Sequence, residues 1–394
     1  MTTHPRKLRG VAIATVAAAA VLVLPAAAPA RDTLGACGPD ADLLAFSDAL
    51  NKTTFDGFGV GGLSALALRG GGHARALVDN QGATAARFYD IDLDAHGDLA
   101  PAVRAVTTLH RADGTPYTGQ DFDGEGLVSL PDGSILASSE TEPAVRRFSR
   151  DGTEIGPLEV PDRFRVAPAG EATGNLTLEG LGLSPGGRDL WAAMEGPLAP
   201  DGTTADGRSR LRFLHYVRHG DSFALAGQIA YLADPLLGVS EVQVTASGDL
   251  LVLERGFQAG VGNTVRVYRA SVRDAADVTD AGSLAAPGVG FVPKALLVDV
   301  GQCPTAGATN PGTQANPLLD NIEGMAIGHG AGGGRRELFL ISDDNFGAGQ
   351  VTRVYELAIG LGPLSQATSA RRRSAPAART YSRSRPRNAF GGSA

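Results

Sequence analysis

One hairpin pattern recurs five times along this chain and restricts its fold more than any other feature. Each copy has a small or acidic residue, an apolar run, a tight turn, a second apolar run and an acidic residue. The copies span Ser64 to Asp79, Glu125 to Glu140, Glu179 to Glu195, Glu241 to Glu254 and Glu323 to Asp343. The two ends of an antiparallel hairpin lie side by side, so the first residue and the last acid of each copy are expected together at its open end.

The residues that follow the hairpins also alternate as strands do. Residues 265–268 (VRVY) and 351–355 (VTRVY) have a spacing of apolar residues that favours strands over helices. We therefore predict an all-β fold, a β-propeller with about five to six four-stranded blades. A sandwich or a jelly roll is the alternative, but neither explains such a regular repeat.

Two details of the ring of blades are open at this point. The widest gap between copies, from Glu241 to Glu323, has room for a sixth, degenerate blade or for long loops. The segment Ala41 to Leu50 is a candidate to close the ring by pairing with the last blade. Because the first strand of each blade lines the central channel of a propeller, the acids of all copies should gather around one mouth of that channel.

The N-terminal segment differs from the rest of the chain. Residues 1–30 combine a basic start, an apolar run from Val11 to Leu24 and the sequence Ala28-Pro29-Ala30. This arrangement predicts a signal peptide that is cleaved near Ala30, and hence a secreted, periplasmic or extracellular protein. An uncleaved N-terminal anchor is the alternative. No later apolar run is long enough to cross a membrane as a helix.

The C-terminal segment conceals the charge of the folded part. Residues 361–394 are rich in Ser, Pro, Ala and Arg, which predicts a disordered tail and leaves residues 31–360 as the folded domain. Three basic residues fall in 1–30 and seven arginines in 361–394, so the domain has 25 basic and 42 acidic residues and a net charge of about −17. Such a body repels nucleic acid and attracts cations. We therefore expect no nucleic-acid partner; as a separate expectation, the protein is a monomer.

The chain has two cysteines, Cys37 and Cys303. In an exported protein an even number of cysteines favours a disulfide, which would tie the N-terminal segment to a late loop rich in Pro and Gly. Two free thiols and a bond to another chain are the alternatives.

Acidic residues gather at the predicted open ends of the hairpins. Carboxylates are hard oxygen ligands, of which Ca²⁺ takes roughly six to eight, and a cation between them relieves their mutual repulsion. For any single acid, the alternative is that it accepts backbone hydrogen bonds in a turn. The set as a whole predicts a Ca²⁺ site. The candidate metal ligands are Asp79, Asp121, Asp123, Glu125, Glu140, Glu179, Glu195, Glu254, Glu323, Asp343 and Asp344.

No pattern for covalent catalysis is present. A G-x-S-x-G elbow is missing, because the segment around Ser64 reads G-L-S-A-L, and the histidines lack zinc-binding spacing. Arg255, which follows Glu254 at the acidic end of a β run, is a candidate either to bind a phosphate or to neutralise a carboxylate.

Three strings carry a resemblance to a known family. Residues 175–198 (NLTLEGLGLSPGGRDLWAAMEGPL), 250–256 (LLVLERG) and 320–346 (DNIEGMAIGHGAGGGRRELFLISDDNF) resemble the phytase-like domain, also described as "esterase-like activity of phytase". The resemblance extends from about residue 60 to 359 and implies an exported bacterial β-propeller that hydrolyses esters or phosphoesters. In phytases of propeller type, calcium ions held by carboxylates at the channel mouth bind the substrate phosphate and activate water. The residues of this chain that correspond to them by resemblance are Glu125, Glu179, Glu323 and Asp343, with Arg255 near the phosphate.

Two functions from different classes follow as hypotheses. The first is a Ca²⁺-dependent phosphoester hydrolase, in which Glu125, Glu179, Glu323 and Arg255 act on a small phosphoester or another anionic ligand. The second is a non-catalytic propeller that binds a ligand or partner at the same face and uses metal ions for structure. Hydrolysis of a lactone or of a carboxylic ester is a further enzymatic alternative.

Overall fold

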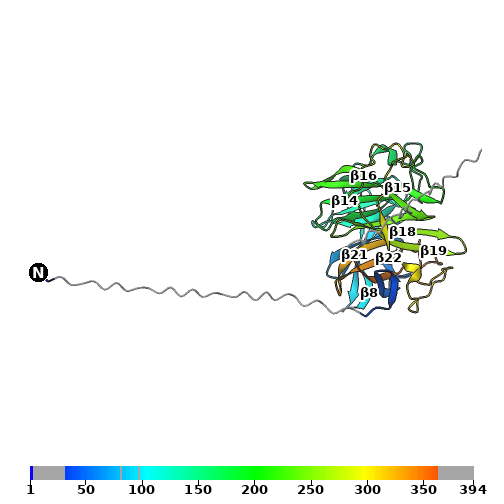
Figure 1. Ribbon diagram of the computed structural model, residues 1–394. Coiled ribbons are helices and arrows are strands. Elements are labelled where there is room, and N and C mark those ends of the chain that lie inside the picture. The colour runs from blue at the N-terminus through cyan, green and yellow to red at the C-terminus, as the bar shows by residue number, and fades with distance from the viewer. Residues whose placement is uncertain (3–31, 80–81, 96–97, 363–394) are drawn as a thin grey trace, which may run out of the picture. The chain divides into compact units, whose positions relative to one another are not determined.

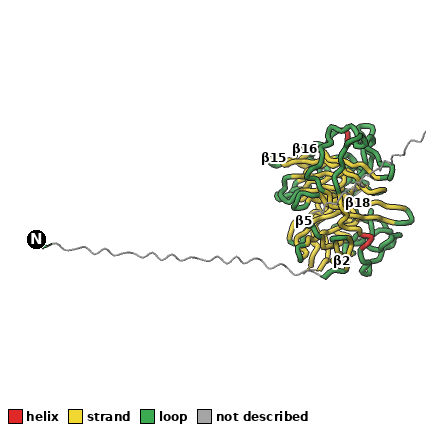
Figure 2. Tube along the Cα trace, viewed as in Figure 1, coloured by secondary structure: helices red, strands yellow, loops and turns green. Residues whose placement is uncertain are grey.

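Strands make up almost all of the regular structure in this computed structural model, which describes residues 1–2, 32–79, 82–95 and 98–362. Figure 2 shows strands and loops throughout, with two short 3-10 helices among the described residues, η1 (Asp162–Phe164) and η2 (Val300–Gln302). None of the helices described is long and apolar enough to cross a membrane. The predicted signal peptide and C-terminal tail lie outside the described residues, apart from residues 1–2 and 361–362.

Three successive four-stranded antiparallel sheets form the first three blades of a propeller. Each blade starts with one copy of the hairpin repeat, whose first strand is innermost. The strands of blade 1 are β5 (Leu63–Gly70), β6 (His73–Val78), β7 (Arg87–Ala95) and β8 (Asp98–Thr108); those of blade 2 are β9 (Gly124–Ser129), β10 (Ile135–Ser139), β11 (Ala144–Phe148) and β12 (Glu154–Pro157); those of blade 3 are β13 (Leu178–Leu183), β14 (Asp189–Met194), β15 (Arg208–His219) and β16 (Ser222–Pro235).

Two further sheets complete the ring, and the last of them contains strands from both ends of the folded region. The innermost strands β5, β9, β13, β17 and β21 contact one another in this order, and β21 contacts β5 again. Figure 1 labels strands of blades 1, 3, 4 and 5. The strands of blade 4 are β17 (Gly238–Val244), β18 (Leu250–Gln258), β19 (Gly262–Ala270) and β20 (Lys294–Asp299); those of blade 5 are β21 (Ile322–Gly332), β22 (Arg335–Ser342), β23 (Val354–Ile359), β2 (Ala41–Ser47) and β1 (Gly35–Gly38).

The predicted propeller is therefore confirmed, with five blades in the described part of the chain. The long gap after Glu241 contains the end of blade 4 and extended loops, and not a sixth blade. A small hairpin precedes blade 1, formed by β3 (Thr54–Phe55) and β4 (Phe58–Gly59). Its turn has positive φ at Asp56 and Gly57, as a two-residue hairpin turn requires.

The N-terminal segment closes the ring as predicted. β2 pairs antiparallel with β23, with Ala41 opposite Ile359. Beyond β2, the buried Arg353 guanidinium donates to both carboxylate oxygens of Asp48 and to the carbonyl oxygens of Thr309 and Pro317. These bonds fasten the segment that follows β2 to the last blade.

The disulfide between Cys37 and Cys303 forms a second link at the closure. Cys37 lies in β1 of blade 5, and Cys303 follows η2 at the end of blade 4. Because the bond joins two neighbouring blades, it restricts opening of the ring where the two ends of the fold meet.

The apolar core is divided into layers between adjacent blades. Leu136 and Val145 of blade 2, for example, belong to the same buried cluster as Leu190 and Tyr216 of blade 3. Each fully buried leucine of this kind contributes about 1.5–3 kcal/mol to folding before entropy is subtracted. The layers hold the inner strands together and thereby position the ends of those strands.

Candidate metal centre

A β-bulge lies near the start of each of the five inner strands. In blade 1 the bulge lies between Leu63 and Ala65, and in blade 5 it lies between Ile322 and Gly324. The other three inner strands have the same irregularity near their first residues. A bulge re-aims the side chain at which it occurs. In blades 2, 3 and 5 the bulge contains Glu125, Glu179 and Glu323 respectively.

The acids that end the hairpins of four blades are held at equivalent positions by the same backbone hydrogen bond. The N–H groups of Asp79, Glu140, Glu195 and Asp343 donate to carbonyl oxygens just before the inner strands, over 2.7 to 3.1 Å. The acceptors are Gly62, Asp123, Thr177 and Asn321. As predicted from the repeat, the leading and trailing acids of blades 2, 3 and 5 therefore meet at the open ends of their hairpins.

The glycine after each of the bulged glutamates is required by the close approach of the inner strands. A Cβ atom on Gly126 would lie 2.4 Å from the carbonyl oxygen of Glu179, and one on Gly180 would lie 2.5 Å from the Cα atom of Glu241. The recurring Glu-Gly pair therefore combines an acid at the mouth with tight packing of the strands beneath it.

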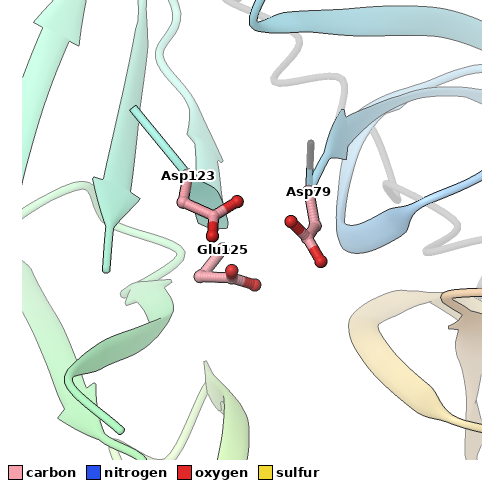
Figure 3. Close-up of side chains that lie close together, drawn as sticks. All are labelled: Asp79, Asp123 and Glu125. Carbon is pink, nitrogen blue, oxygen red and sulfur yellow. The ribbon is translucent and has the colours of Figure 1, made fainter. Parts of the chain in front are cut away.

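Two groups of three carboxylates are brought together by adjacent blades. Asp79 of blade 1 faces Asp123 and Glu125 of blade 2, as Figure 3 shows. The second group joins blades 2 and 3 and consists of Glu140, Glu179 and Glu195. Within each group, one carboxylate oxygen per residue lies within 4.8 Å of those of the other two. Both groups have the size and the ligand type of a cation site.

Arg255 lies against the second group. Its Nη2 atom is 2.7 Å from Glu323 Oε1 and 3.4 Å from Glu195 Oε1. Glu323 also accepts a hydrogen bond of 2.9 Å from the side chain of Asn321. Burial alone would lower the pKa of Arg255, but the negative charges of Glu323 and Glu195 raise it above its ordinary value. Arg255 is thus a permanent positive charge within the acidic mouth, and it neutralises two carboxylates.

Blade 4 corrects one prediction about the mouth. We expected Glu241 and Glu254 to occupy the leading and trailing acid positions, but Val239 pairs with Glu254 and Gly238 with Arg255. The residues that correspond to Glu125 and Glu140 are therefore Ser240 and Arg255. A shift of one residue moves a side chain to the other face of a strand. Blade 4 consequently contributes a cation where the other four contribute an acid.

Glu254 and Glu241 are held away from both acid groups by local partners. Glu254 accepts hydrogen bonds from the Tyr231 hydroxyl at 2.6 Å and from the Asp234 N–H at 2.8 Å, and it pairs with Lys294. Glu241 is fully buried and accepts a hydrogen bond of 2.7 Å from the N–H of Val242.

Four other candidate ligands also lie outside the two groups in the described structure, namely Glu323, which pairs with Arg255, and Asp121, Asp343 and Asp344. Asp121 accepts a hydrogen bond of 2.7 Å from the N–H of Thr118 and pairs with Arg111, and Asp344 accepts one of 3.1 Å from the N–H of Gly62. Asp343 is buried near Glu323, whose negative charge adds to burial in raising the pKa of Asp343. Asp121 and Asp344 thus fit the alternative interpretation, in which acids satisfy backbone groups in turns.

Four acids at the mouth, Asp79, Glu125, Glu140 and Glu179, have raised pKa values because charge is costly to bury. Burial, a hydrogen bond to Asp123 and the negative charges of Asp123, Asp343 and Glu323 raise the pKa of Asp79 to about 10. Burial and the charge of Glu195 raise the pKa of Glu140 to about 8. Burial and the negative charges of Glu179 and Asp79 raise the pKa of Glu125. Burial and the negative charges of Glu195 and Glu140 raise the pKa of Glu179. Such a group of acids has a strong electrostatic reason to accept a cation.

Several of these carboxylates also have oxygen atoms without a hydrogen-bond partner. Among the described residues, Asp79 Oδ1, Asp123 Oδ1 and Glu179 Oε2 are buried and accept no hydrogen bond. An unpartnered buried carboxylate oxygen costs free energy, which a bound cation would recover. The donor chemistry of both groups therefore fits Ca²⁺, with Asp79, Asp123 and Glu125 as ligands in one group and Glu140, Glu179 and Glu195 in the other.

A cavity of about 630 Å³ opens above the acids. It is lined by five of them, by Arg255 and by uncharged residues from several segments that are far apart in the sequence. None of these uncharged residues was predicted from the sequence, because they lie in loops or at the tip of a hairpin, outside the repeated positions. They include Asn175, Phe257, Asn263, Thr313, Gln314 and Gln350.

Comparisons with known proteins relate the chain to one family. The model of a family described as "Phytase-like: Esterase-like activity of phytase" matches residues 59–346. An uncharacterized secreted protein from Arthroderma benhamiae is 26% identical in an alignment of 190 residues, with coverage of 38% of this chain and 37% of that protein. The chain thus aligns with well under half of this relative's length.

Solved structures with a similar chain path have low sequence identity. A gluconolactonase from Xanthomonas campestris is 15% identical, with a TM-score of 0.36, and the match covers 85% of this chain and 99% of the other. The β-propeller domain of Cps50 (Swd1) from Myceliophteria thermophila is 12% identical, with a TM-score of 0.32 and coverage of 76% and 84%. Matches at this level do not identify an activity.

Proposed function

Because the chain belongs to the phytase-like family, we propose that it is a secreted β-propeller that hydrolyses phosphoesters in the presence of Ca²⁺ at its acidic mouth. One observation carries the proposal. Two groups of three acids contain buried carboxylate oxygens without partners, four of the six acids line an open cavity, and Arg255, which pairs with Glu195 of the second group, lines it too. This combination offers ligands for a cation and, next to them, a donor for an anion.

The residues at the mouth have separate roles in this proposal. Asp79, Asp123 and Glu125 would hold one ion, and Glu140, Glu179 and Glu195 would hold another. When bound, Ca²⁺ neutralises phosphate charge and lowers the pKa of a water molecule.

Arg255 is the anion-binding residue of the proposal. Glu323 and Glu195 hold it at the cavity, and its Nε–H group is buried without a partner among the described residues. The side chain as a whole is 20% exposed and lines the cavity, so its outer N–H groups can donate to a phosphate oxygen.

Export of the protein is part of the same proposal. The predicted signal peptide, the disulfide between Cys37 and Cys303 and the similarity to a secreted protein all support it. An oxidising compartment outside the cytoplasm preserves such a disulfide and also supplies calcium.

A hydrolysis panel tests the proposed activity. Purified protein is assayed on phosphomonoesters, phosphodiesters, carboxylic esters and lactones, first with calcium and then with a chelator. We expect turnover of phosphoesters that depends on calcium and is lost in the double variant Glu125→Gln, Glu179→Gln. Glu142→Gln, which removes an exposed carboxylate close to the mouth in sequence, should retain activity.

The other outcomes of the panel separate the alternatives. Absence of turnover on every ester, together with calcium binding, would support a non-catalytic binding propeller. Turnover that is confined to lactones or carboxylic esters would replace phosphoester hydrolysis by the other enzymatic alternative.

A further inference from the structure

The cavity at the mouth has two chemically different sides. The side formed by blades 1, 2, 3 and 5 is acidic, as described above. The neutral side, as we name it here, consists of the tip of the β18–β19 hairpin from Phe257 to Asn263 and of residues 312–314, and its lining side chains carry no charge. A ligand that fills the cavity must therefore present a group suited to cations at one end and a neutral, polar surface at the other.

The neutral side is preformed, because a hydrogen bond and a close backbone contact join its two segments. Gln314 accepts a hydrogen bond of 2.8 Å from the N–H of Asn263 through its side-chain oxygen. Gly262 has a φ of +103°, and a Cβ atom at this position would lie 2.4 Å from the carbonyl oxygen of Thr313. Glycine is thus required both by the backbone conformation and by the contact. A wall fixed in this way can position a ligand without first having to become ordered.

Phe257 stands at the edge of this wall with 67% of its surface exposed. It lines the main cavity and also a neighbouring hollow of about 160 Å³ that includes Leu236. An exposed aromatic ring beside amide side chains offers a flat apolar surface surrounded by hydrogen-bonding groups. The apolar face and the hydroxyl edge of a sugar ring are complementary to such a surface.

Charge limits the number of phosphate groups that the cavity can accept. Arg255 is the one cationic side chain among the described residues that line it, and it already pairs with Glu323 and Glu195. A phosphate monoester carries about −1.5 to −2 charges at neutral pH, so each additional phosphate would need a further cation on the neutral side. That side offers none among the residues that line the cavity.

We propose that the mouth selects a single phosphate group carried by a neutral, hydroxyl-rich ring, such as a hexose monophosphate, and rejects polyphosphorylated rings. The phosphate lies at the side of the acids and Arg255, and the ring lies on Phe257 against Asn263 and Gln314. This substrate class rests on the proposed phosphoester hydrolysis, and Phe257 is its specificity-determining residue.

Three substrates and three variants test the substrate class in the presence of calcium. The substrates are glucose 6-phosphate, glycerol 3-phosphate, which lacks the ring, and inositol hexakisphosphate. We expect kcat/KM for glucose 6-phosphate to exceed that for inositol hexakisphosphate at least about tenfold. Phe257→Ala should lower the value for glucose 6-phosphate about tenfold and leave that for glycerol 3-phosphate nearly unchanged. Phe257→Trp should restore the preference. Leu236→Ala, which removes an exposed apolar side chain from the adjacent hollow, should leave it unchanged.

The outcomes distinguish this inference from the proposed function. A preference for inositol hexakisphosphate, or an equal loss on glucose 6-phosphate and glycerol 3-phosphate in Phe257→Ala, would overturn the substrate class while hydrolysis stands. If no ester is hydrolysed, the proposed function fails. Calorimetry with glucose 6-phosphate in calcium then tests whether the cavity binds the proposed class of ligand. Binding that weakens in Phe257→Ala would support the ligand class, and absence of binding would reject it.

Discussion

Blades 2 and 4 share the same backbone at the mouth but carry opposite charges there. Both inner strands begin with a bulge and pair with the second strand of the hairpin in the same way. Blade 2 places Glu125 and Glu140 at the two mouth positions, whereas blade 4 places Ser240 and Arg255 there. The repeat thus determines where a side chain will lie, and the residue at that position determines what it can bind. The asymmetry provides one fixed cation within a ring of acids.

Placing an acid at the position of Arg255, as in the other four blades, should change the stability of the protein more than any other variant that we propose. Arg255→Glu removes the counter-ion of Glu323 and Glu195 and adds another buried carboxylate. Without calcium we expect the free energy of unfolding to fall by about 3–5 kcal/mol, the usual cost of breaking a buried ion pair. Urea unfolding in chelator measures the loss, and calcium should recover part of it.

The control for Arg255→Glu is the same charge reversal at an exposed arginine. Arg273 lies on the surface in the loop after β19, so Arg273→Glu should change the unfolding free energy by less than about 0.5 kcal/mol. If Arg255→Glu unfolds in chelator at the same urea concentration as the wild type, then Arg255 does not stabilise the acids.

The two acid groups can be compared with each other by removing one ligand from each. Glu125→Gln should weaken calcium binding at the first group and Glu179→Gln at the second, each by about 100-fold, because each variant replaces a charged ligand. Calorimetry should find two ions per chain in the wild type and one tight ion in either variant. Loss of both ions in a single variant would mean that the groups form one site. Asp121→Asn, outside both groups, should retain both ions.

The pH dependence of stability should distinguish the metal-free from the metal-bound mouth. The pKa of Glu140 is raised to about 8 from an ordinary value of 4.5, and that of Asp79 is raised to about 10. The folded protein therefore retains protons that the unfolded chain releases, so a rise in pH above about 4.5 favours unfolding. In chelator we expect the melting temperature to fall between about pH 5 and pH 8, at a cost of up to about 1.4 kcal/mol per pH unit for each such group.

Calcium and a single variant provide the controls for this pH dependence. With calcium the slope should flatten, because the carboxylates then carry their charge in the folded state as well. Glu140→Gln in chelator should be less sensitive to pH than the wild type. A melting temperature that rises from pH 5 to pH 8 in chelator would contradict the raised pKa values.

The sequence predicted much of this arrangement because the repeat carries both the fold and the acids. Glu125, Glu179 and Glu323 are each followed by glycine, and the structure shows why the pair is kept together: the acid occupies a bulge and the glycine allows the next strand to approach. Blade 4 departs from this signal, since Glu241 is followed by Val242. That difference could have revealed the shift of one residue. Aligning blade 4 by its glutamates instead led to the wrong pairing of Glu241 with Glu254.

The neutral wall of the cavity could not be predicted in the same way. Phe257 and Asn263 pair with each other near the tip of the β18–β19 hairpin, Gln314 comes from a loop about fifty residues later, and neither segment repeats in the other blades. Their relative position depends on tertiary contacts, such as the approach of Gly262 to Thr313. Periodic patterns locate strands and the residues at their ends, whereas contacts between loops are specified only by the folded chain.

The smallest expected effect concerns the two blades that have serine at the bulge. Ser64 Oγ donates a hydrogen bond of 3.3 Å to the carbonyl oxygen of Gly124, whereas Ser240 Oγ is buried without a partner among the described residues. Ser240→Ala removes an unsatisfied hydroxyl and should leave stability unchanged or raise it by up to about 1 kcal/mol, while Ser64→Ala should cost about 0.5–1.5 kcal/mol. Urea unfolding of both variants in calcium measures the difference. Equal losses would mean that the Ser240 hydroxyl contributes to stability as much as that of Ser64, and that blade 4 differs from the others in charge alone.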